Sequence, residues 1–366
     1  MQSRTAIGLM SGTSMDGIDA ALLTSDPSGQ LRQGPALAQP YDGETKARLQ
    51  GILGGQGARG EIQATAEHLT HLHAEIIHKL LKENELTHDS IDIIGFHGHT
   101  IMHQPEAGKT CQIGNGALLA RLTGIDVVDD FRSADVAAGG QGAPLAPLYH
   151  GALAAGLAKP LAVVNIGGVA NVTWIGPDGL DGGGDGMLAF DTGPGNAMID
   201  DWVRRCGLGD MDRGGHLAGQ GQVDGAGLAA LMANDYFART PPKSLDRNDF
   251  VLPENPGWSS NDGAATLTAF TARTIALAWN HFPANPKQWL ICGGGRHNPA
   301  LMAALRAELA ADVAPVESVG WRGDFLEAEA FAYLALRHLD GLPLSLPGTT
   351  GVPRPLPGGR LNRHSV

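Results

Sequence analysis

The chain has 366 residues, which is long for one ordinary hydrophobic core and favours two domains. Apolar residues make up 43% of it and charged residues only 17%, a composition typical of a packed globular protein. The formal net charge of −12 argues against nucleic acid or an anionic membrane surface as a partner. An anionic ligand would therefore have to be held by a local site.

The cysteines and the apolar segments of the chain indicate the cellular compartment in which the protein is expected. Cys111, Cys206 and Cys292 are odd in number and widely spaced, so they predict neither a disulfide framework nor a zinc site. The apolar run at residues 6–10 is too short for a signal peptide. Residues 136–158 carry no Asp, Glu, Lys or Arg, but their glycines and prolines break them too often for a membrane-spanning helix. We therefore expect a cytoplasmic protein without a membrane partner.

The first predicted element is a strand at residues 5–10 that turns back into a second strand at residues 20–23. Gly12 and Gly17 in the turn can take backbone angles closed to other residues, and successive turn amides can form an anion-binding concavity. Such a turn suits a polyphosphate, although it is not a Walker loop. The turn's carboxylates would repel phosphate unless a divalent cation lies between them or one does proton chemistry. An ordinary glycine-rich hairpin turn is the alternative.

Residues 61–84 predict an amphipathic helix, because apolar side chains recur at helical spacing from Leu69 to Leu80. At about 100° per residue, His71 and His78 fall opposite the apolar stripe. Both are therefore expected on the surface.

A strand at residues 91–96 is followed by His97, His99 and His103. Their spacing would allow a zinc site, and with it a metal-dependent hydrolase. A turn in which the histidines donate hydrogen bonds is the alternative, and the sequence favours it.

A short helix at residues 117–122 and a strand at residues 125–128 lead into a charged cluster that contains Arg132. A charged cluster at a strand end, followed by a glycine-rich turn, is the usual layout of a site in open α/β sheets. Arg132 is a candidate clamp for an anion or a sugar oxygen, because its planar fork donates paired hydrogen bonds. A structural ion pair with Asp130 or Asp135 is the alternative.

A second pair of strands, residues 161–166 and 169–175, surrounds Gly167 and Gly168. It repeats the pattern of the opening hairpin, which indicates a duplicated architecture with a cleft between the halves. Residues 176–187 are rich in glycine and aspartate and are expected to form a flexible surface loop.

Asp191 ends a predicted strand at residues 188–191, directly before a Gly-Pro-Gly turn. Asn196 is placed to cap the helix predicted at residues 197–203. A carboxylate at residue 191 would project into whatever cleft the sheet edge forms. Hydrogen bonding within the turn is its alternative role.

Further helices are expected at residues 228–237, 262–278 and 299–309, with a strand at residues 288–292. The three glycines that follow this strand, residues 293–295, would let a planar ring approach the backbone, and the next helix N-terminus favours phosphate. An ordinary strand-to-helix connection is the alternative.

The end of the chain adds a helix at residues 323–333, which is expected to bridge the domains. The proline-rich tail after it is expected to be an extended strap.

Several of these segments resemble the anhydro-N-acetylmuramic acid kinase family, in the family's order. The matching patterns are M-S-G-T-S-x-D-G-x-D at residues 10–19, D-F-R-x-x-D-x-A-A-G-G-Q-G-A-P-L at 130–145, F-D-T-G-P-G-N at 190–196, G-G-G-x-x-N at 293–298 and E-A-x-A-F-A at 327–332. The family's G-x-H-G-Q-T pattern is present at residues 95–100, except that His99 stands where Gln is usual.

The resemblance implies the actin, sugar kinase and heat-shock ATPase superfamily. The implied fold is α/β, with two ribonuclease-H-like domains and a nucleotide cleft between them. The expected domains are residues 1–158, with the tail 342–366 packing back on them, and residues 159–341.

The resemblance also implies roles for single residues. Asp191 would be the general base, and Arg132, Glu327 and His97 would bind the substrate. No metal ligand is assigned. The residues implied to bind ATP are Gly12, Thr13, Ser14, Met15, Asp16, Gly17, Ile18, Asp19, Gly167, Gly168, Gly293, Gly294, Gly295 and Asn298.

The implied reaction uses ATP and Mg²⁺ to convert 1,6-anhydro-N-acetylmuramic acid and water into N-acetylmuramic acid 6-phosphate, in murein recycling. The expected assembly is a homodimer. Another sugar kinase of the same superfamily and a non-catalytic nucleotide-binding sensor are the alternatives.

Overall fold

The structure is a computed structural model that describes residues 3–12, 14–182, 186–309 and 311–364. It divides into two compact units: unit 1 comprises Met1–Ala155 and Phe325–Val366, and unit 2 comprises Gly156–Asp324. The fold is α/β, as the sequence predicts. Residues 325–341 belong to unit 1, whereas the sequence assigned them to the second domain.

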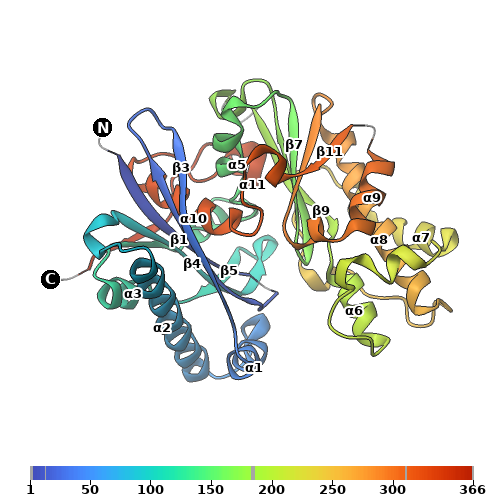
Figure 1. The fold of residues 1–366 in the computed structure, drawn as a ribbon, viewed down its shortest axis with the longest axis horizontal. Coiled ribbons are helices and arrows are strands. Elements are labelled where there is room, and N and C mark those ends of the chain that lie inside the picture. The colour runs from blue at the N-terminus through green and yellow to red at the C-terminus, as the bar shows by residue number, and fades with distance from the viewer. Residues whose placement is uncertain (1–2, 13, 183–185, 310, 365–366) are drawn as a thin grey trace. The chain divides into compact units, whose positions relative to one another are not determined.

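Unit 1 is built on a seven-stranded sheet (Figure 1). An antiparallel run of three strands is extended on the far side of β1 by β4 and β6, which run parallel to it, and then by β12 from the C-terminal tail. β5 pairs with the end of β4. The strands are β1 (Arg4–Ser11), β2 (Gly17–Ser25), β3 (Leu31–Pro40), β4 (Ile93–Gln104), β5 (Lys109–Ile113), β6 (Val127–Asp129) and β12 (Arg360–Asn362).

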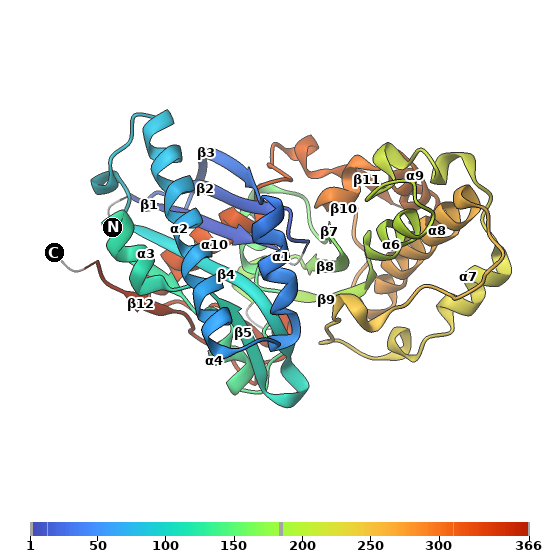
Figure 2. The same cartoon turned by 90° about the horizontal axis from the view of Figure 1, so that it is seen from below.

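Helices cover both faces of this sheet. On one face, Ile7 and Leu9 of β1 join a core with the apolar stripe of α2 (Arg59–Glu83) and with α3 (Gly116–Thr123) (Figure 2). On the other face, Gly8 lies against α10 (Leu326–Leu339), and a Cβ on Gly8 would stand 1.8 Å from the carbonyl oxygen of Ala328. The absent side chain therefore lets α10 press on the strand. The remaining helices of unit 1 are α1 (Gly43–Gly51), α4 (Ser133–Ala137), α5 (Pro147–Leu153) and α11 (Pro347–Thr350).

The histidines of α2 and β4 in unit 1 test two of the sequence predictions. His71 and His78 of α2 are exposed, as predicted. The strand predicted at residues 91–96 continues to Gln104, so His97 and His99 lie within β4 and not in a turn. The continuation forms because β5 folds back and pairs with it from His99 to Gln104.

Unit 2 repeats the strand order of unit 1 in a five-stranded sheet. Its first three strands are antiparallel neighbours, and two later strands are added parallel to the first of them. They are β7 (Leu161–Ile166), β8 (Val169–Ile175), β9 (Met187–Pro194), β10 (Gln288–Cys292) and β11 (Asp312–Pro315). The predicted duplication of the opening hairpin is thus present.

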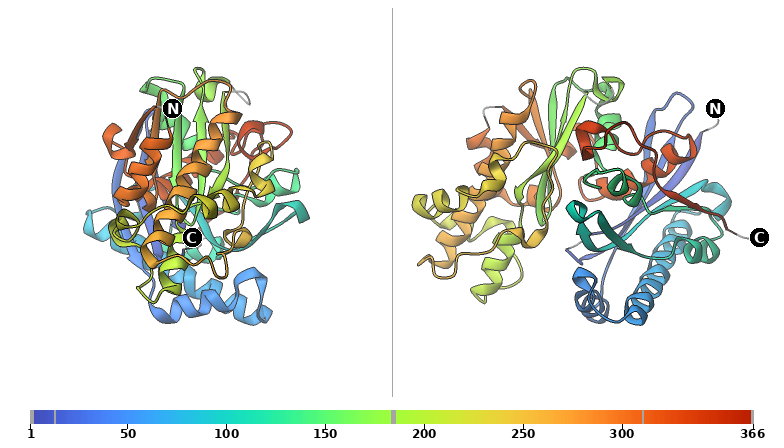
Figure 3. Two further views of the ribbon diagram at one scale, coloured as in Figure 1. Left: turned by 90° about the vertical axis from the view of Figure 1, so that its right-hand side faces the viewer. Right: turned by 180° about the vertical axis from the view of Figure 1, so that it is seen from behind.

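Helices α8 (Ser260–Leu277) and α9 (Pro299–Glu308) pack on one face of this second sheet, where they close a core around Val164 and Ile291 (Figure 3). A separate apolar cluster joins α6 (Ala197–Arg205), α7 (Gly225–Met232) and α8. The helix predicted at residues 228–237 is interrupted, because α7 ends at Met232 and the Asn234 side chain accepts a hydrogen bond from the backbone of Tyr236.

Within the described ranges, the structure contains no helix that combines the length and apolar character needed to cross a membrane. Residues 183–185 of the loop predicted at 176–187 lie outside those ranges.

Candidate active site

The first predicted phosphate loop joins β1 to β2 and closes through a hydrogen bond from the Met15 N–H to the Gly12 carbonyl, 3.0 Å. Among the described residues of this loop, Met15 is left-handed, with φ of 57°, and neither Gly12 nor Gly17 has a positive φ. The sequence placed the unusual backbone angles at the glycines, and this was wrong. Ser14 and Asp16 are exposed, and Thr13 lies outside the described residues.

Packing explains some of the loop residues and not others. A Cβ on Gly17 would lie 2.3 Å from the Gln39 carbonyl oxygen, and Ile18 is buried in the core of unit 1. A Cβ on Gly12 would meet nothing closer than the Ser14 hydroxyl at 3.6 Å. The protein itself therefore requires glycine at position 17 but leaves open space at position 12, which is what a loop that a ligand approaches closely would show.

A buried polar cluster fixes the start of this loop. The Ser11 hydroxyl lies 2.7 Å from the Tyr41 hydroxyl and 2.8 Å from His99 Nδ1. The Tyr41 N–H donates to the Asp16 carbonyl, so Tyr41 holds both ends of the loop. Burial raises the pKa of Tyr41 to about 12 and lowers the pKa of His99 to about 4, so both side chains are neutral. Sequence reasoning missed Tyr41, which follows the third strand and has no local motif.

The three residues predicted to bind the substrate are all in unit 1. Arg132 Nε donates to His97 Nε2 at 3.0 Å, and Arg132 Nη1 donates to the Gly142 carbonyl at 2.5 Å. His97 Nδ1 donates to the Gly98 carbonyl, so the ring is the neutral Nδ1–H tautomer. Burial and then the Arg132 charge hold the pKa of His97 well below its usual value. His97 is thereby fixed as a neutral support for the guanidinium.

Glu327 lies on the first turn of α10, and its side chain is exposed to solvent. Desolvation by the protein atoms around it nevertheless raises the pKa of this carboxyl group, and the positive charge of Arg132 opposes the shift. Glu329, two residues on, is fully buried and accepts hydrogen bonds from Tyr149 Oη (2.7 Å) and Gln33 Nε2 (2.9 Å). Glu327 is therefore the carboxylate available to a ligand, and Glu329 has a structural role.

A cavity of ≈ 200 Å³ in unit 1 adjoins this group. Of the predicted site residues that the structure describes, only His97 lines it; the other residues of the lining include Gln112, Asp129, Asp130, Ser133 and Arg360. Both carboxylate oxygens of Asp129 accept hydrogen bonds from Arg360 of β12, at 2.9 Å each. The C-terminal strand thus forms part of the wall of this cavity.

Asp191 lies within β9, opposite Asn171, and not at a strand end as the sequence suggested. It is 8% exposed, and its Oδ2 accepts a hydrogen bond from the Leu245 N–H at 2.8 Å. β9 continues to Pro194, because residues 187–194 pair with β8 along its whole length. The carboxyl group is therefore held on the edge strand of the second sheet.

The second predicted phosphate loop, Gly167 and Gly168, contacts the turn that follows β9. Gly168 O accepts from the Gly195 N–H at 2.8 Å, and Gly167 O accepts from the Asn196 N–H at 2.8 Å. Asn196 stands at the N-terminus of α6, but its side chain donates to the Ile166 carbonyl at 3.2 Å and does not cap the helix. The predicted capping role was wrong, because the end of β7 offers this carbonyl to the amide.

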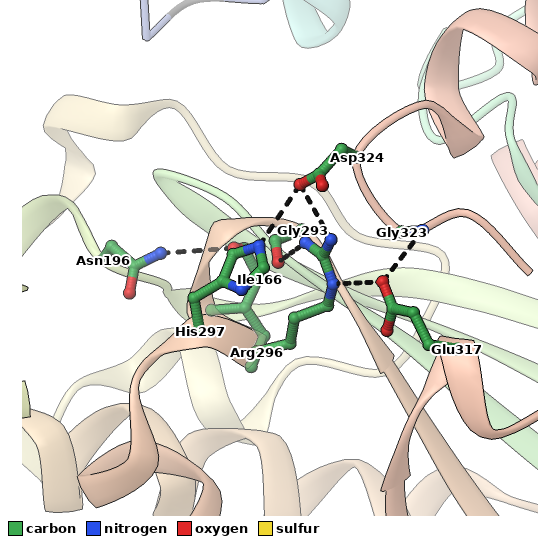
Figure 4. A network of polar contacts seen from close by, with 8 residues as sticks. All are labelled: Ile166, Asn196, Gly293, Arg296, His297, Glu317, Gly323 and Asp324. Carbon is green, nitrogen blue, oxygen red and sulfur yellow. Dashed lines mark hydrogen bonds and ion pairs between the residues drawn. The ribbon is translucent and has the colours of Figure 1, made fainter. Parts of the chain in front are cut away.

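The predicted adenosine segment adjoins the same strand end. β10 runs parallel to β7, so Gly293 and Ile166 lie at neighbouring carboxyl ends of the sheet (Figure 4). Gly293 has φ of +72°, and a Cβ on Gly295 would lie 2.5 Å from the Ile166 side chain, so folding requires both glycines. A Cβ on Gly294 would meet nothing closer than Asn196 at 3.9 Å. Ligands of open α/β sheets bind at such carboxyl ends.

The side chain of Arg296 stabilises the predicted adenosine segment, residues 293–298, through three polar contacts (Figure 4). Its guanidinium donates to the Gly293 carbonyl, to Glu317 and to Asp324, each at 2.8 Å. The side chain of Asn298 accepts from the Leu301 N–H at 3.1 Å and so caps α9. Sequence reasoning missed Arg296, because the two carboxylates that pair with its side chain, Glu317 and Asp324, lie 21 and 28 residues further along the chain.

The described part of the chain contains no group of three or more His, Cys, Asp or Glu side chains arranged to hold a metal ion. His99 is instead engaged with Ser11, and His103 Nδ1 lies 3.0 Å from Thr110 Oγ1. The zinc hydrolase considered from the sequence therefore has no support in the geometry.

Residues 4–361 match the family model described as anhydro-N-acetylmuramic acid kinase. The chain belongs to the anhydro-N-acetylmuramic acid kinase family. Relatives bearing that name are 56% identical in Rhodospirillum rubrum (97% of this chain, 93% of the relative) and 51% identical in Paramagnetospirillum magneticum (97% and 98%). A third, from Rhizorhabdus wittichii, is 49% identical (99% and 100%). Membership of the anhydro-N-acetylmuramic acid kinase family makes the chain a phosphotransferase. The two alternatives from the sequence, another sugar kinase of the superfamily and a non-catalytic nucleotide-binding sensor, are not favoured.

Among solved structures, a hexokinase from Schistosoma mansoni complexed with glucose aligns with 91% of this chain and 85% of its own, at 11% identity and a TM-score of 0.48. A match at that level adds nothing to the assignment of the fold, which depends on the repeated strand order of the two sheets.

Proposed function

We propose that this chain converts 1,6-anhydro-N-acetylmuramic acid, ATP and water into N-acetylmuramic acid 6-phosphate and ADP, with Asp191 as the general base. The observation that supports this assignment is the buried carboxyl group of Asp191, held inside the edge strand that leads into the turn contacting Gly167 and Gly168. The family's F-D-T-G-P-G-N pattern covers this whole region.

The proposed step balances in atoms and protons. Asp191 takes one proton from water as the water oxygen bonds to the anomeric carbon C1. The bond between C1 and the bridging O6 breaks, and O6 bonds to the γ-phosphorus as the bond from that phosphorus to the ADP oxygen breaks. Asp191 then releases its proton to solvent. General base assistance of this kind is worth about 10²- to 10⁴-fold in rate. The rest of the rate enhancement comes from positioning and charge neutralisation.

The sugar would be held by the group in unit 1. The Arg132 fork, fixed by His97 and the Gly142 carbonyl, is suited to a carboxylate or sugar oxygen. The exposed carboxyl group of Glu327 would accept hydrogen bonds from sugar hydroxyl or amide groups.

The nucleotide would be held by the glycine loops. A Cβ at Gly12, Gly167, Gly168 or Gly294 would meet no protein atom, apart from the residue's own chain neighbours, closer than 3.6 Å, so the backbone at these positions is open to a phosphate chain or a ring. Asp16 is exposed in the first loop, and Mg²⁺ is typically held by one or two carboxylates, waters and substrate phosphates. When bound, the ion would neutralise phosphate charge.

We also propose a cytoplasmic homodimer.

One labelling experiment distinguishes this reaction from that of an ordinary hexose kinase. The protein is incubated with ATP, Mg²⁺ and the anhydro sugar in ¹⁸O-water, and the product is analysed by mass spectrometry. We expect one ¹⁸O at C1. A phosphorylated product without label would rule out ring opening by water.

A second experiment addresses the sensor alternative. Asp191→Asn should lower turnover by at least about 10²-fold while ATP affinity stays close to that of the wild type. Wild-type turnover in this variant would exclude Asp191 as the base.

A further inference from the structure

Asp191 lies on an edge strand, and one segment of unit 2 takes the place of the missing neighbour. The second sheet ends at β9, so within the described residues no further strand pairs with the backbone groups on its outer side. At Asp191 both groups are nevertheless bonded: its N–H donates to the Lys243 carbonyl at 3.1 Å, and its carbonyl accepts from Tyr236 Oη at 2.6 Å. Residues 236–245 therefore hold the backbone of this residue from both sides of its Cα.

The same segment also reaches the side chain. The Leu245 N–H donates to Asp191 Oδ2 at 2.8 Å. A hydrogen bond from a backbone N–H to a carboxylate is charge-assisted and fixes the position of that oxygen. Backbone N, backbone O and Oδ2 of Asp191 are thus all tied to residues 236–245.

Tyr236 is well placed to act as a fixed donor in this arrangement. It is 4% exposed, and its ring packs edge-on against Phe237 and Phe250, with centroid separations of 5.9 and 6.2 Å. The ammonium group of Lys243 lies 4.6 Å from the centre of the same ring. Burial, followed by the charge of Asp191, raises the pKa of Tyr236, so its hydroxyl keeps the proton that it donates.

We propose that Tyr236 is a positioning residue for the reaction, and that its hydroxyl sets the place of the Asp191 carboxyl group through the backbone carbonyl. This inference rests on the proposed role of Asp191 as general base. Misplacement of a reacting group by about 1 Å can cost about 10²-fold in rate, so a single hydroxyl can matter without touching the substrate. Neither the sequence motifs nor the family pattern at residues 190–196 includes this tyrosine.

The first test replaces Tyr236 by Phe, which removes one oxygen and keeps the packed ring. We expect kcat with ATP and the anhydro sugar to fall by about 10- to 100-fold, while both KM values change by less than about twofold. Tyr333→Phe is the matched control, because within the described residues that hydroxyl hydrogen-bonds only to Arg337 of the same helix, at 3.2 Å. Its kcat should stay at the wild-type value.

The second test asks whether Tyr236 acts through Asp191. In an Asp191→Asn background, adding Tyr236→Phe should leave the residual rate unchanged, because two changes to one functional unit are not additive. Leu245→Pro removes the N–H that donates a hydrogen bond to Asp191 Oδ2 and leaves Tyr236 in place. It should show the same loss of kcat. If Tyr236→Phe does not yield folded protein, this variant still tests whether the contacts from residues 236–245 position Asp191.

Two results would overturn the inference while leaving the proposed function intact. One is wild-type kcat in folded Tyr236→Phe. The other is an equal further loss of rate when Tyr236→Phe is added to Asp191→Asn. Absence of turnover in the wild-type protein would instead remove the proposed reaction, and the role of Tyr236 with it.

Discussion

Replacing Gly168 by Ala should weaken ATP binding without weakening the fold. A Cβ at this position would lie 3.9 Å from the nearest side chain, that of Ala197, which is an ordinary van der Waals distance. The residue has no left-handed backbone angle that an L side chain would strain. Replacement of Gly by Ala at such a position stabilises a protein by about 0.4–1 kcal/mol through the unfolded chain. Unfolding measurements should therefore give equal or slightly higher stability.

The added methyl group would instead occupy the space that we assign to a phosphate. We expect the Kd for ATP to rise at least tenfold, which is about 1.4 kcal/mol of binding free energy. Isothermal titration calorimetry measures the Kd, and thermal unfolding measures the stability of the same preparation.

Gly295→Ala is the matched comparison in the same unit. Its Cβ would lie 2.5 Å from the Ile166 side chain, so the neighbours must shift, and such overpacking typically costs about 1–3 kcal/mol of stability. Gly168→Ala with wild-type ATP affinity would refute the assignment of the second phosphate loop. Marked destabilisation by Gly168→Ala would refute the reading of open space around it.

His99→Gln should keep KM for ATP near the wild-type value, because an amide can still bond to the Ser11 hydroxyl, whereas His99→Leu should raise it about fivefold, the equivalent of about 1 kcal/mol. Equal kinetics in both variants would contradict the role of this contact. Arg132→Lys should lower kcat/KM for the anhydro sugar about 10²-fold, because one ammonium group cannot reproduce bonds to both His97 and Gly142; an unchanged value would exclude Arg132 from the sugar site. Each histidine that is neutral when folded should make its full contribution to the free energy of unfolding above about pH 6.5. Below that, the free energy of unfolding should fall towards pH 4 by about 1.4 kcal/mol per pH unit for each such histidine. Urea unfolding between pH 4.5 and 7 measures this slope, and a flat profile would contradict burial as the cause of the pKa of about 4 at His73, His99 and His150.

The strand pattern was predictable because it depends on local alternation of apolar residues. Both opening hairpins, at residues 4–25 and 161–175, follow from such alternation around a glycine turn. The length of β4 was not predictable, because it depends on β5 folding back onto it. Likewise, the interior position of Asp191 in β9 depends on pairing with β8 that continues past Asp191 to Pro194.

Residues that support the site from a distance had no sequence signal. Tyr41 reaches Ser11 across 30 residues, and Tyr236 reaches Asp191 across 45 residues. Motifs identify residues that share a local backbone conformation, whereas these tyrosines act through tertiary contacts formed after the strands are in place. The loop glycines show the same division, since only the three-dimensional surroundings separate Gly168, which has open space, from Gly295, which has none.

The path of the chain has a consequence for its synthesis. Unit 2 is one continuous stretch inserted between two parts of unit 1, and α10, which covers the face of β1 at Gly8, comes from the second part. On the ribosome, residues 156–324 emerge as a complete set and can fold at once. The first sheet, by contrast, lacks the cover of α10 on one face until residues beyond 324 have left the exit tunnel. Nascent chains that stall before residue 325 should therefore be the ones that recruit chaperones.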